Sequence, residues 1–211
     1  KQTMDCIILA GGKGSRMEDS LPKALVEVAG KPILSHQLDY LSNKVDKIVL
    51  SLGYKSEDIV DYINQKHRTN IDFSIENEPL GTAGGLKLAL QKTNSDLVLA
   101  LNCDDITDIN IAELARRNHN TICVSHPVLP FGLVNVYCGY AEFIEKPTLD
   151  EWVSCGWYLI KKDANTQLPD KGSLEYDVFP KMKLRVYPHE GFWKALNTKK
   201  DVEDFEKNLK K

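Results

Sequence analysis

Segments with strand character and segments with helical character alternate along the first 125 residues of the chain. Apolar runs that suit buried strands are found at 4–10, 47–52, 71–75, 96–101 and 121–125. Apolar residues recur at helical spacing within 33–41, 56–63, 82–91 and 109–116. Strands joined by helices require right-handed crossovers, so the alternation predicts an open, mostly parallel sheet. The expected fold class is α/β, with a three-layer, Rossmann-like arrangement.

Proline and glycine divide the chain beyond Pro127 into short β-rich pieces, predicted at 133–137, 141–144, 157–160 and 184–187. No linker precedes them, so we expect a small antiparallel β addition and edge strands within the same domain. A final helix is predicted from about Lys199, because its apolar residues recur at helical spacing. Residues 1–211 are therefore predicted to form one domain.

Composition excludes several function classes. The formal net charge of −3 over 211 residues argues against nucleic acid or an anionic membrane as a partner. No apolar stretch approaches the roughly 18 residues that a membrane span needs. The five cysteines are scattered, mostly in apolar stretches, and never form a Cys-x-x-Cys pair. This pattern predicts buried free thiols in a reducing, cytoplasmic setting and argues against a zinc site.

A glycine-rich loop follows the first predicted strand, with three glycines at positions 11, 12 and 14. Glycine lets the backbone approach a ligand closely, and successive N–H groups in such a turn form a concave anion site. Arg16 and Lys23 add two cations. A Rossmann fingerprint would need glycine at Met17, and a P-loop would need Ser or Thr after Lys13. The loop predicts a triphosphate site, and the alternative is a turn with two solvated cations.

Two further groups of polar residues follow predicted strands. The segment 78–85 has glycines that allow a planar base to lie against the backbone. It can equally be a capping loop with Thr82 as the helix N-cap, and the two roles are compatible. Asp104 follows an apolar strand, where a carboxylate can hold Mg²⁺ against phosphate oxygens. The alternative is a capping acid, which is the role expected for Asp105 and Asp108.

Glu145 and Lys146 form a third group, at the end of a short predicted strand. Lys146 can place a point charge on a phosphate, and Glu145 can accept hydrogen bonds from hydroxyl groups. This pattern indicates a sugar phosphate, with a surface ion pair as the alternative.

These motifs, taken in order, resemble the sugar-1-phosphate nucleotidyltransferases, or NDP-sugar pyrophosphorylases, over nearly the whole chain. The resemblance is strongest to the mannose- and heptose-1-phosphate guanylyltransferases, for which Glu78-Pro79-Leu80-Gly81-Thr82-Ala83-Gly84 is typical. The motifs that carry it are the glycine loop, that segment, Asn102-Cys103-Asp104, Glu145-Lys146-Pro147, 154–158, 173–180 and 191–193. It implies the nucleotide-diphospho-sugar transferase fold, with a nucleotide-binding part at about 1–125, a sugar-phosphate-binding part at about 126–197 and a C-terminal helix at 198–211.

The resemblance also implies site residues. Those implied to bind the nucleotide are Leu9, Ala10, Gly11, Gly12, Gly14, Ser15, Glu78, Gly81 and Thr82, with Arg16 and Lys23 as catalytic cations. Those implied to bind the sugar phosphate are Gly132, Glu145, Lys146, Ser154 and Gly156. Asp104 is implied to hold Mg²⁺ as the cofactor.

Two positions depart from the family pattern. The family usually has an aspartate after Gly-x-Trp that completes the metal site, whereas here Trp193 is followed by Lys194-Ala195-Leu196-Asn197. Asn197 offers a neutral oxygen in its place. Ser154 stands where the family usually has an asparagine that contacts the sugar.

The predicted reaction joins a sugar 1-phosphate to a nucleoside triphosphate, giving an NDP-sugar and pyrophosphate. GTP and a mannose- or heptose-type sugar are the expected substrates. One alternative is a cytidylyl-, uridylyl- or thymidylyltransferase acting on another sugar or alcohol phosphate. Another is a non-catalytic regulatory paralogue that binds nucleotide sugars, and a homo-oligomer is left open.

Overall fold

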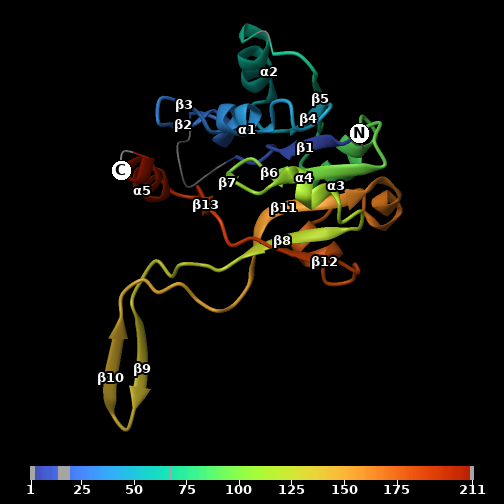
Figure 1. The fold of residues 1–211 in the computed structure, drawn as a ribbon. Helices are drawn as coiled ribbons and strands as arrows, with labels where there is room; N and C mark the ends of the chain where they lie inside the picture. The colour runs from blue at the N-terminus through green and yellow to red at the C-terminus, as the bar shows by residue number, and fades with distance from the viewer. Residues whose placement is uncertain (1–2, 14–19, 67, 210–211) are drawn as a thin grey trace.

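The computed structural model describes residues 3–13, 20–66 and 68–209 (Figure 1). Its centre is a seven-stranded sheet in the order β12-β8-β11-β6-β1-β4-β5. The strands are β1 Asp5–Leu9, β4 Ile48–Leu52, β5 Ile71–Ile75, β6 Leu97–Asn102, β8 Thr121–Ser125, β11 Val153–Lys161 and β12 Arg185–Pro188. All neighbours are parallel except β11, which is antiparallel to both β6 and β8.

Helices and three small two-stranded sheets surround this sheet. The helices are α1 Ile33–Leu41, α2 Ser56–Gln65, α3 Gly81–Leu90, α4 Ile111–Ala115 and α5 Lys199–Leu209, with 3-10 turns η1 Lys23–Leu25 and η2 Lys162–Gln167 and a π-helical turn η3 Leu174–Val178. The small sheets pair β2 Glu27–Val28 with β3 Lys31–Pro32, β7 Asp105–Thr107 with β13 Trp193–Ala195, and β9 Leu133–Tyr137 with β10 Tyr140–Ile144. Among the described residues, no helix is long and apolar enough to cross a membrane.

Side chains of the central strands alternate between two buried clusters. In β1, Cys6 and Ile8 pack with residues of α1, α2, α4 and α5, whereas Ile7 packs with residues of α3 and η3. The sheet is therefore covered on both faces, and the predicted three-layer α/β fold is confirmed. The terminal helix predicted from about Lys199 is α5.

Residues 157–160 were expected, with the other pieces beyond Pro127, in an antiparallel addition or an edge strand, and this expectation is wrong for them. They belong to the nine-residue strand β11, which lies inside the main sheet between β6 and β8 rather than at an edge. The run from Cys155 to Ile160 is buried throughout, as suits a strand covered on both faces. Edge strands were expected among the pieces beyond Pro127, and 184–187 provides one, because β12 lies at an edge of the sheet.

The antiparallel addition is confirmed, and it projects away from the body of the molecule. We call residues 126–152 the ribbon: it comprises β9, β10 and the two segments that connect them to the sheet (Figure 1). Cys138 and Gly139 form its two-residue turn with φ of 48° and 84°. Positive φ at both central residues is the pattern of a type I′ turn, which matches the twist of an antiparallel pair.

Candidate functional site

A cavity of about 910 Å³ opens at the carboxyl ends of β1, β4, β5 and β6. In open parallel sheets, ligands bind at this edge. The predicted site residues that line it are Leu9, Ala10, Gly11, Gly12, Lys23, Glu78, Gly81, Thr82, Asp104 and Asn197. Residues of the glycine loop, the 78–82 segment and the strand-end aspartate thus meet in one place.

Other predicted residues lie elsewhere. Gly14, Ser15 and Arg16 lie outside the described residues. Gly132, Glu145 and Lys146 belong to the ribbon, which projects from the body of the molecule (Figure 1). None of them is among the residues that line the cavity. Their part in binding a sugar phosphate stays a prediction.

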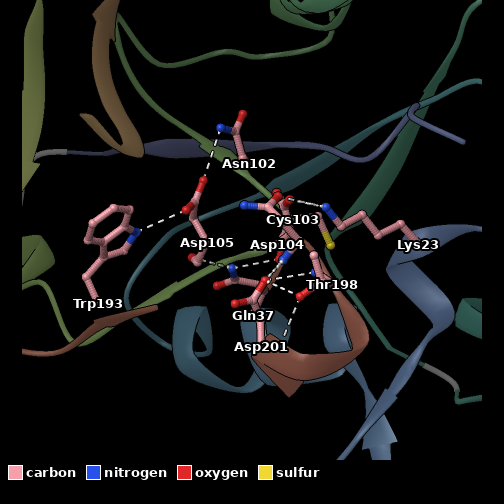
Figure 2. Close-up of polar contacts among 10 residues, drawn as sticks. Lys23, Gln37, Asn102, Cys103, Asp104, Asp105, Trp193, Thr198 and Asp201 are labelled. Atoms are coloured by element: carbon pink, nitrogen blue, oxygen red, sulfur yellow. Dashed lines mark hydrogen bonds and ion pairs between the residues drawn. The ribbon is translucent and has the colours of Figure 1, made fainter. Parts of the chain in front are cut away.

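Lys23 contacts two of the other lining residues of the cavity, Asp104 and Asn197. Its ammonium forms an ion pair with the carboxylate of Asp104 (Figure 2). It also donates a hydrogen bond of 3.2 Å to Asn197 Oδ1. One oxygen from the turn after β6 and one from the loop before α5 therefore converge on a single positive charge.

The turn that carries Asp104 is fixed from several sides. Gln37 Nε2 donates hydrogen bonds to the carbonyl oxygens of Cys103 (3.0 Å) and Asp105 (2.8 Å), on either side of Asp104. The Trp157 indole N–H donates to the Asp105 carbonyl at 2.9 Å, and the Leu196 N–H donates to the Asp104 carbonyl at 2.9 Å. Gln37 and Trp157 are buried, so this turn is held by the core.

Asn197 is fixed by a capping box at the start of α5. The Asp201 carboxylate accepts hydrogen bonds from the N–H groups of Asn197 (3.1 Å) and Thr198 (2.8 Å). Thr198 Oγ1 accepts in turn from the Asp201 N–H at 3.2 Å, which satisfies two free donors of the helix start. Burial alone would raise the pKa of Asp201, but the hydrogen bonds from Thr198 and the charge of Lys194 lower it.

The prediction that Asp105 and Asp108 cap the next helix is wrong. Asp105 is buried, and its carboxylate accepts from Trp193 Nε1 at 3.0 Å and from Asn102 Nδ2 at 3.2 Å (Figure 2). Burial and the neighbouring Asp104 charge raise the pKa of Asp105 to about 7. Asp108 instead accepts from the Phe192 N–H at 2.7 Å, and Asn110 caps α4 through Glu113 N at 3.1 Å.

Gly156 and Ser154 lie in β11, behind the lining residue Asn102. Gly156 has φ +75°, and a Cβ there would come 1.9 Å from Asp105 Oδ2. Only glycine therefore lets β11 pass so close to the Asn102–Asp105 pair. Ser154 Oγ accepts from the Gly156 N–H at 3.2 Å, which supports this irregular stretch of the strand.

The prediction of Thr82 as an N-cap is also wrong, because α3 begins at Gly81 and its N-cap residue is Leu80. Thr82 Oγ1 donates to Glu175 at 2.9 Å and accepts from the Leu174 N–H at 2.8 Å. The hydroxyl therefore ties the start of α3 to η3, which lies more than 90 residues later in the chain. Thr82 and Glu175 both line the cavity.

Glu76 is a lining residue that the sequence reasoning missed. One carboxylate oxygen accepts from the Leu80 N–H at 3.2 Å, and the other lies 2.5 Å from where a Cβ on Gly53 would be. Burial raises the pKa of Glu76, and the Leu80 hydrogen bond offsets only part of this effect. Its position directly after a strand was the available signal, since the same reasoning selected Asp104.

The donors around Asp104 are compatible with Mg²⁺. Asp104 and Asn197 already direct oxygens at one cationic group, and Mg²⁺ commonly takes one or two protein oxygens together with substrate phosphates. Within the part of the chain that the structure describes, no group of three or more His, Cys, Asp or Glu residues could hold a metal ion. A metal at this position would therefore depend on phosphate oxygens for the rest of its ligands.

A doubly covered, mostly parallel sheet with a cavity beyond its carboxyl ends defines a Rossmann-like α/β protein. The family model described as MobA-like NTP transferase domain matches residues 6–128, and the chain belongs to that family. The predicted resemblance to the nucleotidyltransferases is thereby confirmed.

Named relatives agree with this assignment. The mannose-1-phosphate guanyltransferase of Schizosaccharomyces pombe is 34% identical over 94% of this chain, and that of Saccharomyces cerevisiae is 32% identical over the same share. The chain spans about 62% of the length of these relatives.

Solved structures show the same fold. HddC from Yersinia pseudotuberculosis, complexed with GMP-PN, superposes with a TM-score of 0.78 at 26% identity, covering 97% of this chain and 99% of that one. A putative glucose-1-phosphate thymidylyltransferase from Bacillus anthracis, in complex with a sucrose, gives a TM-score of 0.76 at 19% identity, covering 98% and 95%. At that identity the second likeness supports the fold alone.

Proposed function

We propose that the chain is a sugar-1-phosphate guanylyltransferase, which joins a sugar 1-phosphate to GTP and releases pyrophosphate. The convergence of Lys23, Asp104 and Asn197 beside a glycine-rich backbone, in a cavity at the carboxyl ends of the strands, carries this proposal. The guanyltransferases among the relatives, and the HddC structure complexed with GMP-PN, support it.

In the proposed reaction, a phosphate oxygen of the sugar 1-phosphate attacks the α-phosphorus of GTP. The bond from that phosphorus to the bridging oxygen breaks, and pyrophosphate leaves with the electron pair. The attacking phosphate is largely a dianion at neutral pH, with a second pKa of about 6, so no general base is required. This agrees with the cavity, which has no histidine among its described lining residues.

Charge stabilisation is then the main task of the protein. Lys23 and the N–H groups of the loop at Gly11 and Gly12 supply positive charge and hydrogen-bond donors to phosphate oxygens. Asp104 and Asn197 would hold Mg²⁺, which adds positive charge against the same oxygens when it is bound. Arg16 is proposed as the second catalytic cation.

The base end of the cavity supports guanine. Glu76 and Glu78 line it, and ionised carboxylates can only accept hydrogen bonds. The guanine edge presents N1–H and N2–H₂ donors side by side, whereas cytosine presents acceptors at the corresponding positions. Gly81 and Thr82 complete this end of the cavity, on the side of α3.

The sugar is proposed to lie at the opposite end, beside Asn102 and Gly156. A mannose- or heptose-type sugar is the expected acceptor, by similarity to the named relatives. Glu145 and Lys146 are proposed to serve its phosphate, and Gly132 and Ser154 are proposed to shape that region. A cytoplasmic location remains the prediction from the thiol pattern.

Pyrophosphate release tests the proposal directly. Purified protein would be offered GTP, CTP, UTP or dTTP in turn, each with mannose, heptose or glucose 1-phosphate and with Mg²⁺. We expect turnover with GTP and a mannose- or heptose-type acceptor. Turnover only with CTP, UTP or dTTP would replace the guanylyltransferase assignment by one of the alternatives.

A non-catalytic nucleotide-sugar sensor is the second candidate. It is favoured by the single carboxylate at the metal position, where Asp104 is accompanied by the neutral Asn197. This candidate predicts calorimetric binding of GDP-sugars without pyrophosphate release at any Mg²⁺ concentration. The same substrate panel, with a binding measurement added, separates the two.

A further inference from the structure

Glu175 is a lining carboxylate that neither the phosphates nor the Mg²⁺ of the proposed reaction requires. Among the described residues, the carboxylates that line the cavity are Glu76, Glu78, Asp104 and Glu175. Asp104 forms an ion pair with Lys23, and Lys171 Nζ lies 3.5 Å from Glu78 Oε2. Glu175 pairs with no lysine, arginine or histidine in the part of the chain that the structure describes. Its charge is therefore available to a ligand.

The segment that carries Glu175 is anchored across the start of α3. We call residues 170–177 the strap. The Gly172 N–H donates to the Leu80 carbonyl at 2.9 Å, and the Ala83 N–H donates to the Gly172 carbonyl at 2.9 Å. This reciprocal pair of backbone hydrogen bonds fixes the strap beside the cavity.

The Glu175 side chain is held by two hydroxyl groups. Thr82 Oγ1 donates to Glu175 Oε2 at 2.9 Å, and Ser173 Oγ donates to the same oxygen at 2.8 Å. The other carboxylate oxygen, Oε1, accepts from none of the described residues. A side chain that is fixed in advance loses less conformational entropy when a ligand binds. Oε1 is therefore a preorganised acceptor at the cavity.

The start of η3 does not need this carboxylate as a cap. Ser173 is the N-cap residue, and its Oγ accepts from the Tyr176 N–H at 3.2 Å. Asp177 Oδ2 accepts in turn from the Ser173 N–H at 2.7 Å, an exchange of the capping-box kind. Capping thus accounts for Asp177 but leaves the carboxylate of Glu175 without an explanation.

The chemistry of a carboxylate restricts what Glu175 can bind. An ionised carboxylate only accepts hydrogen bonds, so its ligand must be a donor. A phosphate oxygen is an acceptor with negative charge, and it would be repelled. The N–H groups of guanine are proposed to face Glu76 and Glu78. Hydroxyl groups, on the ribose of the nucleotide or on the sugar of the acceptor, are the donors that remain.

We propose that Glu175 is a specificity-determining residue, whose Oε1 accepts a hydrogen bond from a hydroxyl group of the bound substrate. The inference rests on the proposed nucleotidyl transfer, because that reaction supplies a ribose and a sugar. Recognition of a hydroxyl is the chemistry that both sources share. A substrate that lacks the hydroxyl leaves Oε1 without its donor, so deoxy analogues bind more weakly.

Two series of substrate analogues distinguish the two sources. Calorimetry would compare GTP with 2′-deoxy-GTP and 3′-deoxy-GTP, and KM in pyrophosphate release would compare mannose 1-phosphate with its 2-, 3-, 4- and 6-deoxy analogues. If another nucleotide or sugar gives turnover, its own deoxy analogues are used. We expect wild type to prefer the parent compound roughly 10-fold or more in one series, because the acceptor is charged. That series identifies the source of the hydroxyl.

The variant Glu175→Ala should reduce this preference to about 1. A merely structural role would weaken the parent and the deoxy analogue by the same factor and leave the preference unchanged. Asp177→Ala is the matched control, because it removes another carboxylate of the strap that does not line the cavity. It should keep the wild-type preference. A cooperative thermal melt would verify each fold, and Glu175→Gln, whose amide oxygen can still accept from Thr82 and Ser173, would replace Glu175→Ala if its melt is lost.

Two results would overturn the proposal. One is wild-type protein that uses every deoxy analogue as well as the parent compound. The other is a wild-type preference that the folded Glu175 variant retains. Either result in a protein that still releases pyrophosphate removes the role of Glu175 and leaves the proposed function intact. Absence of turnover with every nucleotide would instead contradict the proposed function, while the calorimetric series still tests Glu175.

Discussion

Lys23 and Asp104 form an ion pair at the cavity although they are 81 residues apart in the sequence. Lys23 begins the short turn η1 after the glycine loop, and Asp104 follows the central strand β6. The pair joins the two halves of the proposed phosphate site. Both side chains are 22% exposed, so a ligand can reach them from the cavity.

Lys23→Ala should therefore reduce turnover without unfolding the protein. Removing one positive group that stabilises a transition state costs roughly 100- to 1,000-fold in kcat. Pyrophosphate release with GTP and the best acceptor would measure the loss, with Lys207→Ala on α5 as the control for removing an exposed lysine. If Lys23→Ala kept wild-type turnover while folding normally, the proposed phosphate site would be contradicted.

Glu76→Gln should affect both pH-dependent stability and nucleotide choice. Burial raises the pKa of Glu76 above the ordinary 4.5, so above that pH the folded state holds its proton more tightly than the unfolded state does. Wild-type stability should then fall as pH rises from about 4.5 through the higher folded-state pKa, and the variant should lack this contribution. Urea denaturation across pH 4–8 would measure the difference.

Glu76→Gln also tests whether the Glu76 carboxylate accepts a hydrogen bond from the guanine base of GTP. Loss of a hydrogen bond to a charged acceptor costs about 1.5–3 kcal/mol, or roughly 10- to 100-fold in GTP affinity. Glu57→Gln, an exposed position on α2, serves as the matched control. Unchanged GTP affinity in Glu76→Gln would remove Glu76 from the base-binding end of the cavity.

Substitutions at two glycines should have different effects, one on stability and the other on nucleotide binding. A Cβ on Gly84 would lie 2.3 Å from the Asp170 carbonyl oxygen, so Gly84→Ala must push α3 away from that loop. We expect a loss of about 1–3 kcal/mol in unfolding free energy, as is usual for overpacking. A Cβ on Gly12 would meet nothing within 4 Å, so Gly12→Ala should keep wild-type stability.

Gly12→Ala should instead weaken nucleotide binding, because its methyl group occupies space proposed for phosphate oxygens. Thermal melts and calorimetric titration with GTP would be run on both variants. Gly12→Ala with unchanged GTP affinity would argue that the phosphates lie away from the loop.

Local sequence patterns predicted the strands and most of the residues that line the cavity. Both can be recognised from a few neighbouring residues, because most of the lining residues directly follow a strand. The apolar run of β6 and the acid that follows it lie within eight residues, so Asp104 could be placed at a strand end. The role of Asp105 could not be predicted in this way. It lies in β7, which has only three residues, and its hydrogen-bond partner Trp193 is 88 positions away in the sequence. Strand order depends on such distant pairs too, so the local pattern could not show that β11 lies inside the main sheet.

The ribbon illustrates the same limit. The sequence predicted that Glu145 and Lys146 lie at the end of a short strand, and this position is confirmed, because both residues directly follow β10. Sequence could not show that this strand leaves the sheet, because no local signal records where a hairpin points. The distance between these two residues and the cavity is a tertiary property.

Asn197→Asp should strengthen metal binding. Asn197 directs its side-chain oxygen at the same point as Asp104, and Asp201 and Thr198 hold its backbone in place. A carboxylate there would supply a second negative ligand, so we expect tighter Mg²⁺ binding in the presence of GTP and turnover at lower Mg²⁺ concentration. Calorimetric titration of Mg²⁺ into the GTP complex would measure the affinity apart from catalysis. Asn118→Asp, at an exposed position after α4 that does not line the cavity, controls for added charge. Equal Mg²⁺ affinity in all three proteins would place the metal elsewhere.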